Sequence, residues 1–143
     1  MRRCILLFAI GLIICAPAMA VDTAPRDGPA MAEARALVKE KRWVAAISYL
    51  TRLSVLEPSA DVFNLLAFSQ RNNGDHVSAL ANYMQSLALD PDHLGAHEYL
   101  GELYVKTGEM AKARALMTRL EQLCPQGCEE RDDLAAAIAA AGG

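Results

Sequence analysis

Two cysteines near the C-terminus, Cys124 and Cys128, are the residues whose type and spacing most directly suggest chemistry. Three residues separate them, whereas a redox-active pair usually has two residues between its cysteines and lies beside a βαβ pattern, of which this sequence shows no sign. Two thiolates would also supply only half of the ligands of a zinc site. A structural disulfide is therefore the favoured interpretation, and redox and metal roles remain open as alternatives.

Two histidines offer a second possible site. His93 and His97 are four residues apart, so they share one face if both lie in the same helix, with Glu98 beside them, and such spacing can hold a metal ion. The structural interpretation is stronger, because His97 stands where the bulky residue Phe63 stands 34 residues earlier. His93 stands where we expect a helix to begin, and a polar residue is ordinary there. No metal site is therefore predicted.

The sequence contains no recognisable catalytic motif. Serine and cysteine nucleophiles do not occur with a histidine and an acid in a known arrangement, and there is no glycine-rich phosphate loop. We accordingly predict no catalytic residue, no cofactor and no enzymatic activity.

A pattern typical of a secretory signal peptide opens the chain. Arg2-Arg3 forms a positive start, residues 4–16 are almost all apolar, and Ala18-Met19-Ala20 is a small-x-small cleavage sequence, which predicts cleavage after residue 20. The apolar run is shorter than the roughly 20 residues that span a bilayer. We therefore expect an exported protein that does not insert in a membrane after cleavage.

Cleavage would change both the charge and the cysteine count. Residues 1–20 contain two arginines and no acidic residue, so the formal charge would fall from −3 to −5. An acidic chain argues against nucleic acid as a partner, because such binding relies on lysine and arginine at the phosphates. Cys4 and Cys15 would be lost, and the remaining even pair in an exported protein is interpreted first as a disulfide.

A repeat with a period of 34 residues organises the middle of the chain. Two consecutive copies share a turn glycine, an alanine in the second helical segment and a closing proline, at Gly74 and Gly108, Ala79 and Ala113, and Pro91 and Pro125. A weaker copy precedes them, with Ala46 and Pro58 each 33 residues before its counterpart. Apolar residues recur at helical spacing in each copy, so each copy predicts a pair of helices joined by a short turn.

This pattern resembles the tetratricopeptide repeat. The resemblance covers about residues 27–127 and implies an all-α fold, an α-solenoid of about three helical hairpins. After these, residues 128–141 begin with acidic residues and continue with one weakly apolar face, which predicts a C-terminal capping helix. The expected organisation is a signal peptide at 1–20, a flexible segment at 21–29, a repeat domain at 30–127 with repeats at about 27–60, 60–93 and 94–127, and a capping helix and tail at 128–143.

The resemblance also implies a binding surface, because the first helix of each hairpin lines a concave groove in that family. The groove positions expected in the two clear repeats are Asn64, Phe68, Arg71, Asn72, Glu98, Glu102, Val105 and Lys106; those expected in the weak first repeat are Met31, Arg35, Val38 and Lys39. Phe68 is either an exposed anchor for a partner or a residue packed under the neighbouring helix. Some members of the family grip a C-terminal carboxylate with lysine, arginine and asparagine, but only Asn64 matches that set.

The function expected from the resemblance is that of a non-enzymatic adaptor, which binds a protein or peptide of the cell envelope in its groove. The runs at 95–104, 123–130 and 133–138 also resemble small exported bacterial tetratricopeptide proteins, so we expect the periplasm of a Gram-negative bacterium. The alternative is a periplasmic protein that handles metal through His93 and His97, or thiols through Cys124 and Cys128. The sequence makes no prediction of the partner's identity or of the oligomeric state.

Overall fold

The computed structural model of this protein describes residues 28–142. The predicted signal peptide at 1–20, and the predicted flexible segment as far as residue 27, lie outside the described residues. Within the described part the chain is all helical, and its seven helices are α1 (Pro29–Lys39), α2 (Trp43–Leu56), α3 (Ala60–Asn72), α4 (His76–Leu89), α5 (Leu94–Lys106), α6 (Met110–Leu123) and α7 (Glu129–Ala140).

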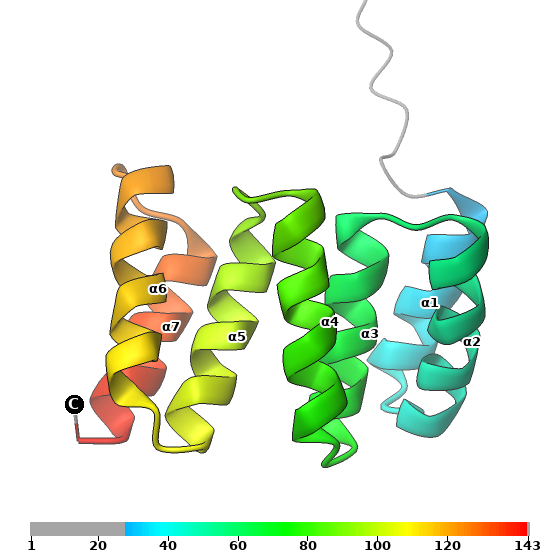
Figure 1. Cartoon of the computed structure of the whole chain (residues 1–143), viewed down its shortest axis with the longest axis horizontal. Coiled ribbons are helices and arrows are strands. Elements are labelled where there is room, and N and C mark those ends of the chain that lie inside the picture. Colours follow the sequence, from blue (N-terminus) through cyan, green and yellow to red (C-terminus); the bar gives the residue numbers. More distant parts are fainter. Residues whose placement is uncertain (1–27, 143) are drawn as a thin grey trace, which may run out of the picture.

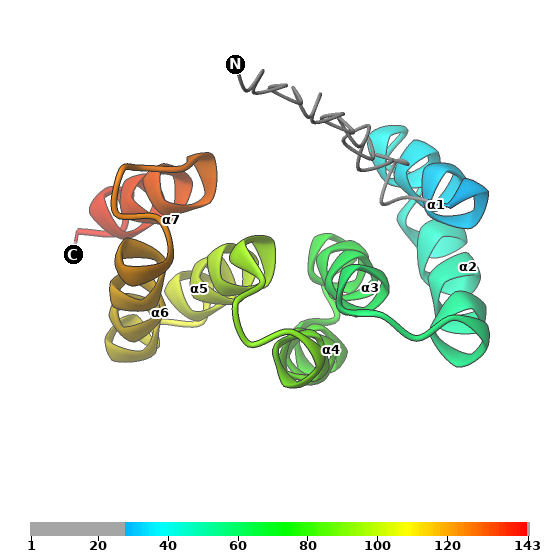
Figure 2. The same ribbon diagram turned by 90° about the horizontal axis from the view of Figure 1, so that it is seen from above.

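The first six helices form three hairpins that stand side by side, and α7 lies against the last hairpin (Figure 1). Seen from above, the row bends into an arc, with α1, α3, α5 and α7 on the inner side and α2, α4 and α6 on the outer side (Figure 2). This arrangement confirms the predicted all-α solenoid. None of the helices between residues 28 and 142 is long and apolar enough to cross a membrane.

Small and branched side chains hold the hairpins together. The repeated alanines Ala46, Ala79 and Ala113 are fully buried, because a methyl group at these positions lets two helices approach closely. One apolar cluster joins α1, α2 and α3, and a second joins α3, α4 and α5 around the fully buried ring of Tyr83. Each hairpin therefore buries its apolar face against a neighbour, as a solenoid requires.

The turns inside the hairpins explain the repeated glycines. Gly74 and Gly108 have φ values of +89° and +80°, a region that glycine enters at little cost because it lacks a Cβ. The first hairpin places Lys41 at the equivalent position, with φ of 56°. The chain thus keeps the same turn there without a glycine. The second helix of each hairpin ends in the same way, because α2, α4 and α6 each end two residues before a proline.

Two contacts attach the capping helix α7 to the repeats, one within the helix and one just before it begins. Leu134 is fully buried against Gly101 of α5, where an added Cβ would lie 2.6 Å from both Leu134 methyl groups. Before the helix begins, the sulfurs of Cys124 and Cys128 lie 2.09 Å apart, at disulfide distance. Glu129, together with other acids of the first turn, faces the positive end of the α7 dipole.

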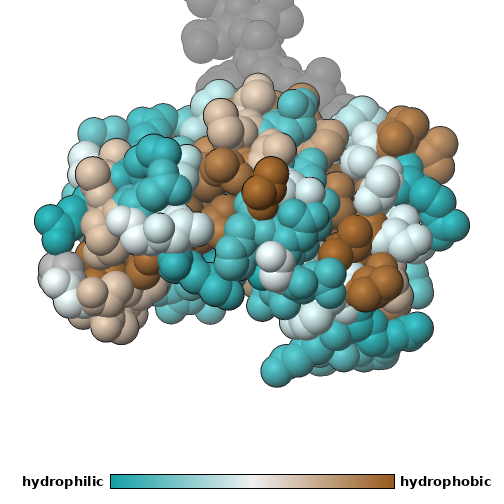
Figure 3. Space-filling model, turned by 60° about the horizontal axis from the view of Figure 1, so that its bottom comes forward, coloured by the Kyte–Doolittle hydropathy of each residue, from teal (hydrophilic) through white to brown (hydrophobic). Residues whose placement is uncertain are grey.

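The surface at the turn end of the hairpins is mixed in character. Figure 3 shows apolar side chains there in separate patches among hydrophilic ones. Exposed large apolar residues occur on the outer helices, for example Val55 and Leu56 on α2 and Val77 and Met84 on α4. Val55 and Leu56 border an apolar hollow of about 430 Å³, and Met84 borders another of about 490 Å³ with residues of α5 and α6. Each of these hollows has one charged side chain in its lining, whereas the inner side of the arc brings several together.

Candidate functional site

A cavity of about 480 Å³ lies in the groove on the inner side of the arc. Four helices and the residue before α5 contribute to its wall, so it exists only because the hairpins stack. We call this cavity the groove cavity, and its lining residues are Arg35, Val38 and Lys39 of α1, Asp61, Asn64, Leu65 and Phe68 of α3, His93, Gly95, Glu98 and Tyr99 at α5, and Glu130 of α7.

The lining shows a regular register between α3 and α5. Three pairs of residues that are 34 positions apart face the cavity together: Asp61 with Gly95, Asn64 with Glu98, and Leu65 with Tyr99. Residues spaced by three and four lie on one helix face, so a search for repeat positions at this spacing would have found Leu65 and Tyr99. The groove positions expected from the sequence include neither of them, nor Asp61, His93, Gly95 and Glu130.

Aromatic rings form part of the groove wall. Phe68 lines the cavity and is half-buried. Its ring centroid lies 4.8 Å from that of Tyr99 on α5 and 6.1 Å from that of Trp43 on α2. One side of the Phe68 ring therefore packs between helices while the residue also borders the cavity, and its role as an anchor for a partner stays a prediction.

The side chain of Arg71 makes contacts within the fold and does not line the groove cavity. Its guanidinium lies 5.4 Å from the ring centroids of both Phe68 and Tyr99, and Nη1 donates to the carbonyl of Tyr99 over 3.3 Å. The same nitrogen forms an ion pair with Glu102, and the two side chains are 13% and 27% exposed. Arg71 and Glu102 therefore tie α3 to α5, and neither lines the groove cavity.

The other expected groove residues lie outside the cavity. Asn72 is exposed and its Nδ2 donates to the carbonyl of Phe68 over 2.8 Å. Val105 and Lys106 are in the last turn of α5 and do not line the cavity. Met31 packs in the apolar core of the first hairpin. The cavity thus uses Asn64, Phe68 and Glu98 from the two clear repeats, and Arg35, Val38 and Lys39 from the first.

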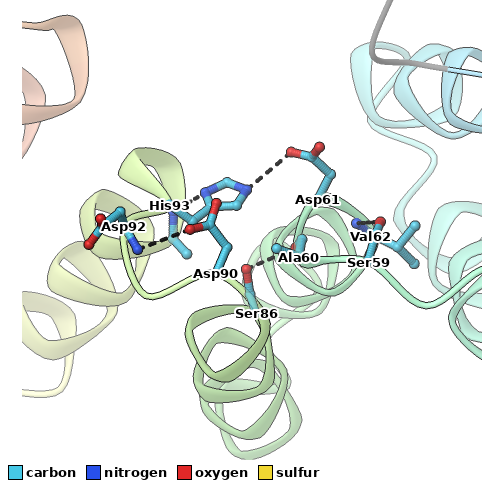
Figure 4. A network of polar contacts seen from close by, with 9 residues as sticks. Ser59, Ala60, Asp61, Val62, Ser86, Asp90, Asp92 and His93 are labelled. Atoms are coloured by element: carbon cyan, nitrogen blue, oxygen red, sulfur yellow. Dashed lines mark hydrogen bonds and ion pairs between the residues drawn. The ribbon is translucent and has the colours of Figure 1, made fainter.

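A network of polar contacts fixes the start of α3 against the start of α5 (Figure 4). Ser59 caps α3 by accepting from the Val62 amide, while Nδ1 of His93 caps α5 by accepting from the Ala96 amide over 3.1 Å. Because Nδ1 accepts, the proton of the neutral ring is on Nε2, which donates to Asp61 over 3.1 Å. His93 is therefore the cap of α5.

His97 is likewise engaged in the fold. It is 6% exposed, and its Nε2 donates to the carbonyl of Pro91 over 2.9 Å. Burial lowers the pKa of His97, so the ring is held neutral. Among residues 28–142, no group of three or more histidines, cysteines, aspartates or glutamates is placed to hold a metal ion.

Two polar side chains of the groove cavity are buried without a matching partner. Glu98 is 6% exposed, and within residues 28–142 its carboxyl group makes no hydrogen bond or ion pair. Burial raises its pKa to about 8, and the negative charges of Glu102, Asp133 and Glu130 add to the rise, while Arg71 opposes it. Asn64 is 8% exposed, and its Oδ1 has no hydrogen-bond partner.

Comparison with known proteins identifies the repeats. Residues 71–141 match the family model described as tetratricopeptide repeat. The chain is a tetratricopeptide repeat protein. Its groove is thus the inner surface of a tetratricopeptide solenoid, and the match reaches from the end of α3 to the end of α7.

A curated relative shares part of this tetratricopeptide region. The chain is 37% identical over 67 residues to the probable biofilm formation methyltransferase WspC of Pseudomonas putida. The aligned stretch is 47% of this chain but only 16% of that protein. The likeness therefore concerns a small part of the relative.

Solved tetratricopeptide-like structures have the same overall fold. The type III secretion translocator chaperone SycD of Yersinia enterocolitica has a TM-score of 0.70 at 17% identity, covering 79% of this chain and 81% of its own. PcrH, solved in complex with the chaperone binding region of PopB, has a TM-score of 0.66 at 18% identity, covering 78% and 90%. At these identities the comparison establishes the fold alone.

Proposed function

We propose that this tetratricopeptide protein is an exported, non-enzymatic adaptor that holds a segment of a polypeptide partner in the groove cavity. The observation that carries the proposal is the cavity itself, since α1, α3, α5 and α7 all contribute side chains to one concave wall. Its lining combines apolar and aromatic residues with seven polar or charged ones, so it can offer a ligand both apolar contact and polar partners.

Two further observations support a polypeptide ligand. The structurally similar PcrH was solved with the binding region of another protein, so a solenoid of this shape is able to hold such a segment. The N-terminal pattern of residues 1–20 favours export, and we therefore propose a partner in the cell envelope and a location in the periplasm of a Gram-negative bacterium.

The metal alternative has less support from the geometry. His93 would have to release its contact with Asp61 or with the Ala96 amide, and the one unbonded ring nitrogen of His97, Nδ1, is buried. The thiol alternative would require the bonded sulfurs of Cys124 and Cys128 to be reduced first.

An affinity capture with matched variants tests the proposal. The wild-type protein is used as bait in an extract of its own source cells, beside a double variant of the groove, Val38→Glu with Lys39→Glu, both of which line the cavity. A double variant on the outer side, Arg114→Glu with Thr118→Glu, serves as the control, since both residues are exposed on α6 and the pair changes the net charge by −3, as the groove variant does.

We expect one defined partner to be retained by the wild type and by the α6 control, and to be lost from the groove variant. Retention by both variants would place the contact on another surface. A wild-type bait that retains nothing specific would contradict the adaptor function.

A further inference from the structure

We propose that the groove cavity recognises a basic side chain, lysine or arginine, of its polypeptide partner, with the carboxyl group of Glu98 as the main acceptor and Asn64 as a second polar contact. This inference rests on the proposed function, because it names the chemistry of the partner that the groove takes. Glu98 and Asn64 occupy equivalent positions of consecutive repeats and line the same cavity.

Glu98 is an acceptor that the described fold does not use. A buried carboxyl group is normally compensated by a hydrogen bond or a cation, because burial without one is costly. Here Glu98 is 6% exposed and has neither among residues 28–142. Arg71, the nearby cation, is committed to Glu102, to the Tyr99 carbonyl and to two aromatic rings. A ligand that brings its own cation would supply what the site lacks.

The surroundings of Glu98 favour positive charge on one side of the groove. Glu130 and Asp133 of α7 act electrostatically on Glu98, and within the described chain neither is held in a hydrogen bond or an ion pair. Arg35 and Lys39 line the cavity on α1, with Asp61 on α3 and His93 before α5. A bound segment is therefore oriented, with its basic residue toward α5 and α7.

Asn64 is the second, independent observation. Its side chain is more than nine-tenths buried at the cavity wall, and its Oδ1 has no hydrogen-bond partner. An amide can present either its oxygen or its NH₂ group by rotation about its last side-chain bond. Asn64 can therefore accept from an ammonium or guanidinium group that is bound at Glu98.

Proton release distinguishes a binding role of Glu98 from a purely structural one. A pKa of about 8 leaves Glu98 mostly protonated at pH 7, whereas a cation bound against it would require the carboxylate. Binding at about pH 7 should then release about 0.9 proton per complex. A glutamate that only fills space would release none.

The test begins with a library of random peptides selected on three purified proteins, namely the wild type, Glu98→Gln and Glu121→Gln. Glutamine resembles the protonated glutamate in shape and charge, so Glu98→Gln should fold. Glu121 is exposed on α6 and provides the control. We expect lysine or arginine at one fixed position, enriched about 10-fold or more on the wild type and on Glu121→Gln, and at background on Glu98→Gln.

A selected peptide is then measured by calorimetry in buffers of different ionisation enthalpy. We expect release of about 0.9 proton with the wild type and none with Glu98→Gln, and an affinity loss of about 10-fold or more when norleucine replaces the basic residue of the peptide. Selected peptides that lack a basic preference, or that keep it on Glu98→Gln, would overturn this inference alone. If the wild type selects no peptide at all, the proposed function fails together with it.

Discussion

Replacing Glu98 with glutamine should change how the stability of the protein depends on pH. The pKa of Glu98 is raised from 4.5 to about 8 in the folded protein, so the folded state holds a proton that the unfolded chain releases between these values. Deprotonation therefore favours unfolding, and the wild type loses stability as the pH rises from about 4.5 to about 8. The variant has no such group and should not show this loss.

The size of the effect follows from the same values. At 1.36 kcal/mol per pKa unit, the wild type is destabilised relative to Glu98→Gln by about 3 kcal/mol at pH 7, with an upper bound of about 5 kcal/mol above pH 8. Below about pH 4.5 both states of the wild type are protonated, and the two proteins should unfold with nearly equal free energies. Both values are upper limits, because the Glu98 carboxyl group borders the groove cavity and solvent there screens its charge.

Urea unfolding at several pH values from about 4 to 9 measures this difference directly. Trp43, the single tryptophan of the chain, packs near Phe68 and provides the fluorescence probe. Subtracting the two proteins removes the contributions of titrating groups that do not interact with Glu98, and Glu121→Gln gives the baseline for loss of an exposed carboxylate. A difference that stays constant with pH, or that grows in acid, would refute the reasoning about Glu98.

Three other perturbations test the packing of the solenoid, each by the free energy of unfolding in urea. Gly101→Ala should destabilise the protein by about 1–2 kcal/mol, because the new Cβ would collide with the Leu134 methyl groups. In a Leu134→Ala background the same substitution should be neutral or stabilising. A loss of stability that persists in that background would contradict the clash. Lys41→Gly should stabilise the protein by about 0.5–1 kcal/mol, because Lys41 has a φ of 56° that glycine adopts at lower cost. A less stable variant would show that the turn is not strained. Arg71→Ala should destabilise the protein by about 3 kcal/mol and Glu102→Gln by about 1 kcal/mol. The second loss is smaller because Arg71 keeps its contacts with Tyr99 when Glu102 is neutral. A larger loss from Glu102→Gln than from Arg71→Ala would contradict this account of the pair.

The sequence was sufficient to predict the fold because the repeated residues occur at the turns and at the buried contacts between helices. Gly74 and Gly108 are at turns with positive φ, which glycine adopts most easily, and Ala79 and Ala113 are fully buried where two helices approach closely. In each case the residue type alone indicates the local structure. The weaker first repeat was also recognised, although Lys41 replaces the turn glycine. Local residue type and spacing therefore determine the course of the backbone here.

The groove was only partly predictable, because long side chains are directed by their neighbours. Arg71 is in the first helix of its hairpin as expected, but two rings and Glu102 draw it across to α5. His93 resembles one half of a metal pair in the sequence, and only the approach of α3 shows that it bridges to Asp61. Contacts between repeats depend on the distance between helices, which the period alone does not provide.

Site-specific photo-crosslinking tests the central claim, that the groove cavity holds a polypeptide, most directly. A benzophenone amino acid is placed in the source cells at Lys39, which is exposed and lines the cavity, or at Thr118, which is exposed on the outer helix α6. We expect irradiation to join the protein at position 39 to one defined polypeptide and to yield no such product at position 118. Equal products at both positions, or a product at position 118 alone, would contradict a partner bound in the groove.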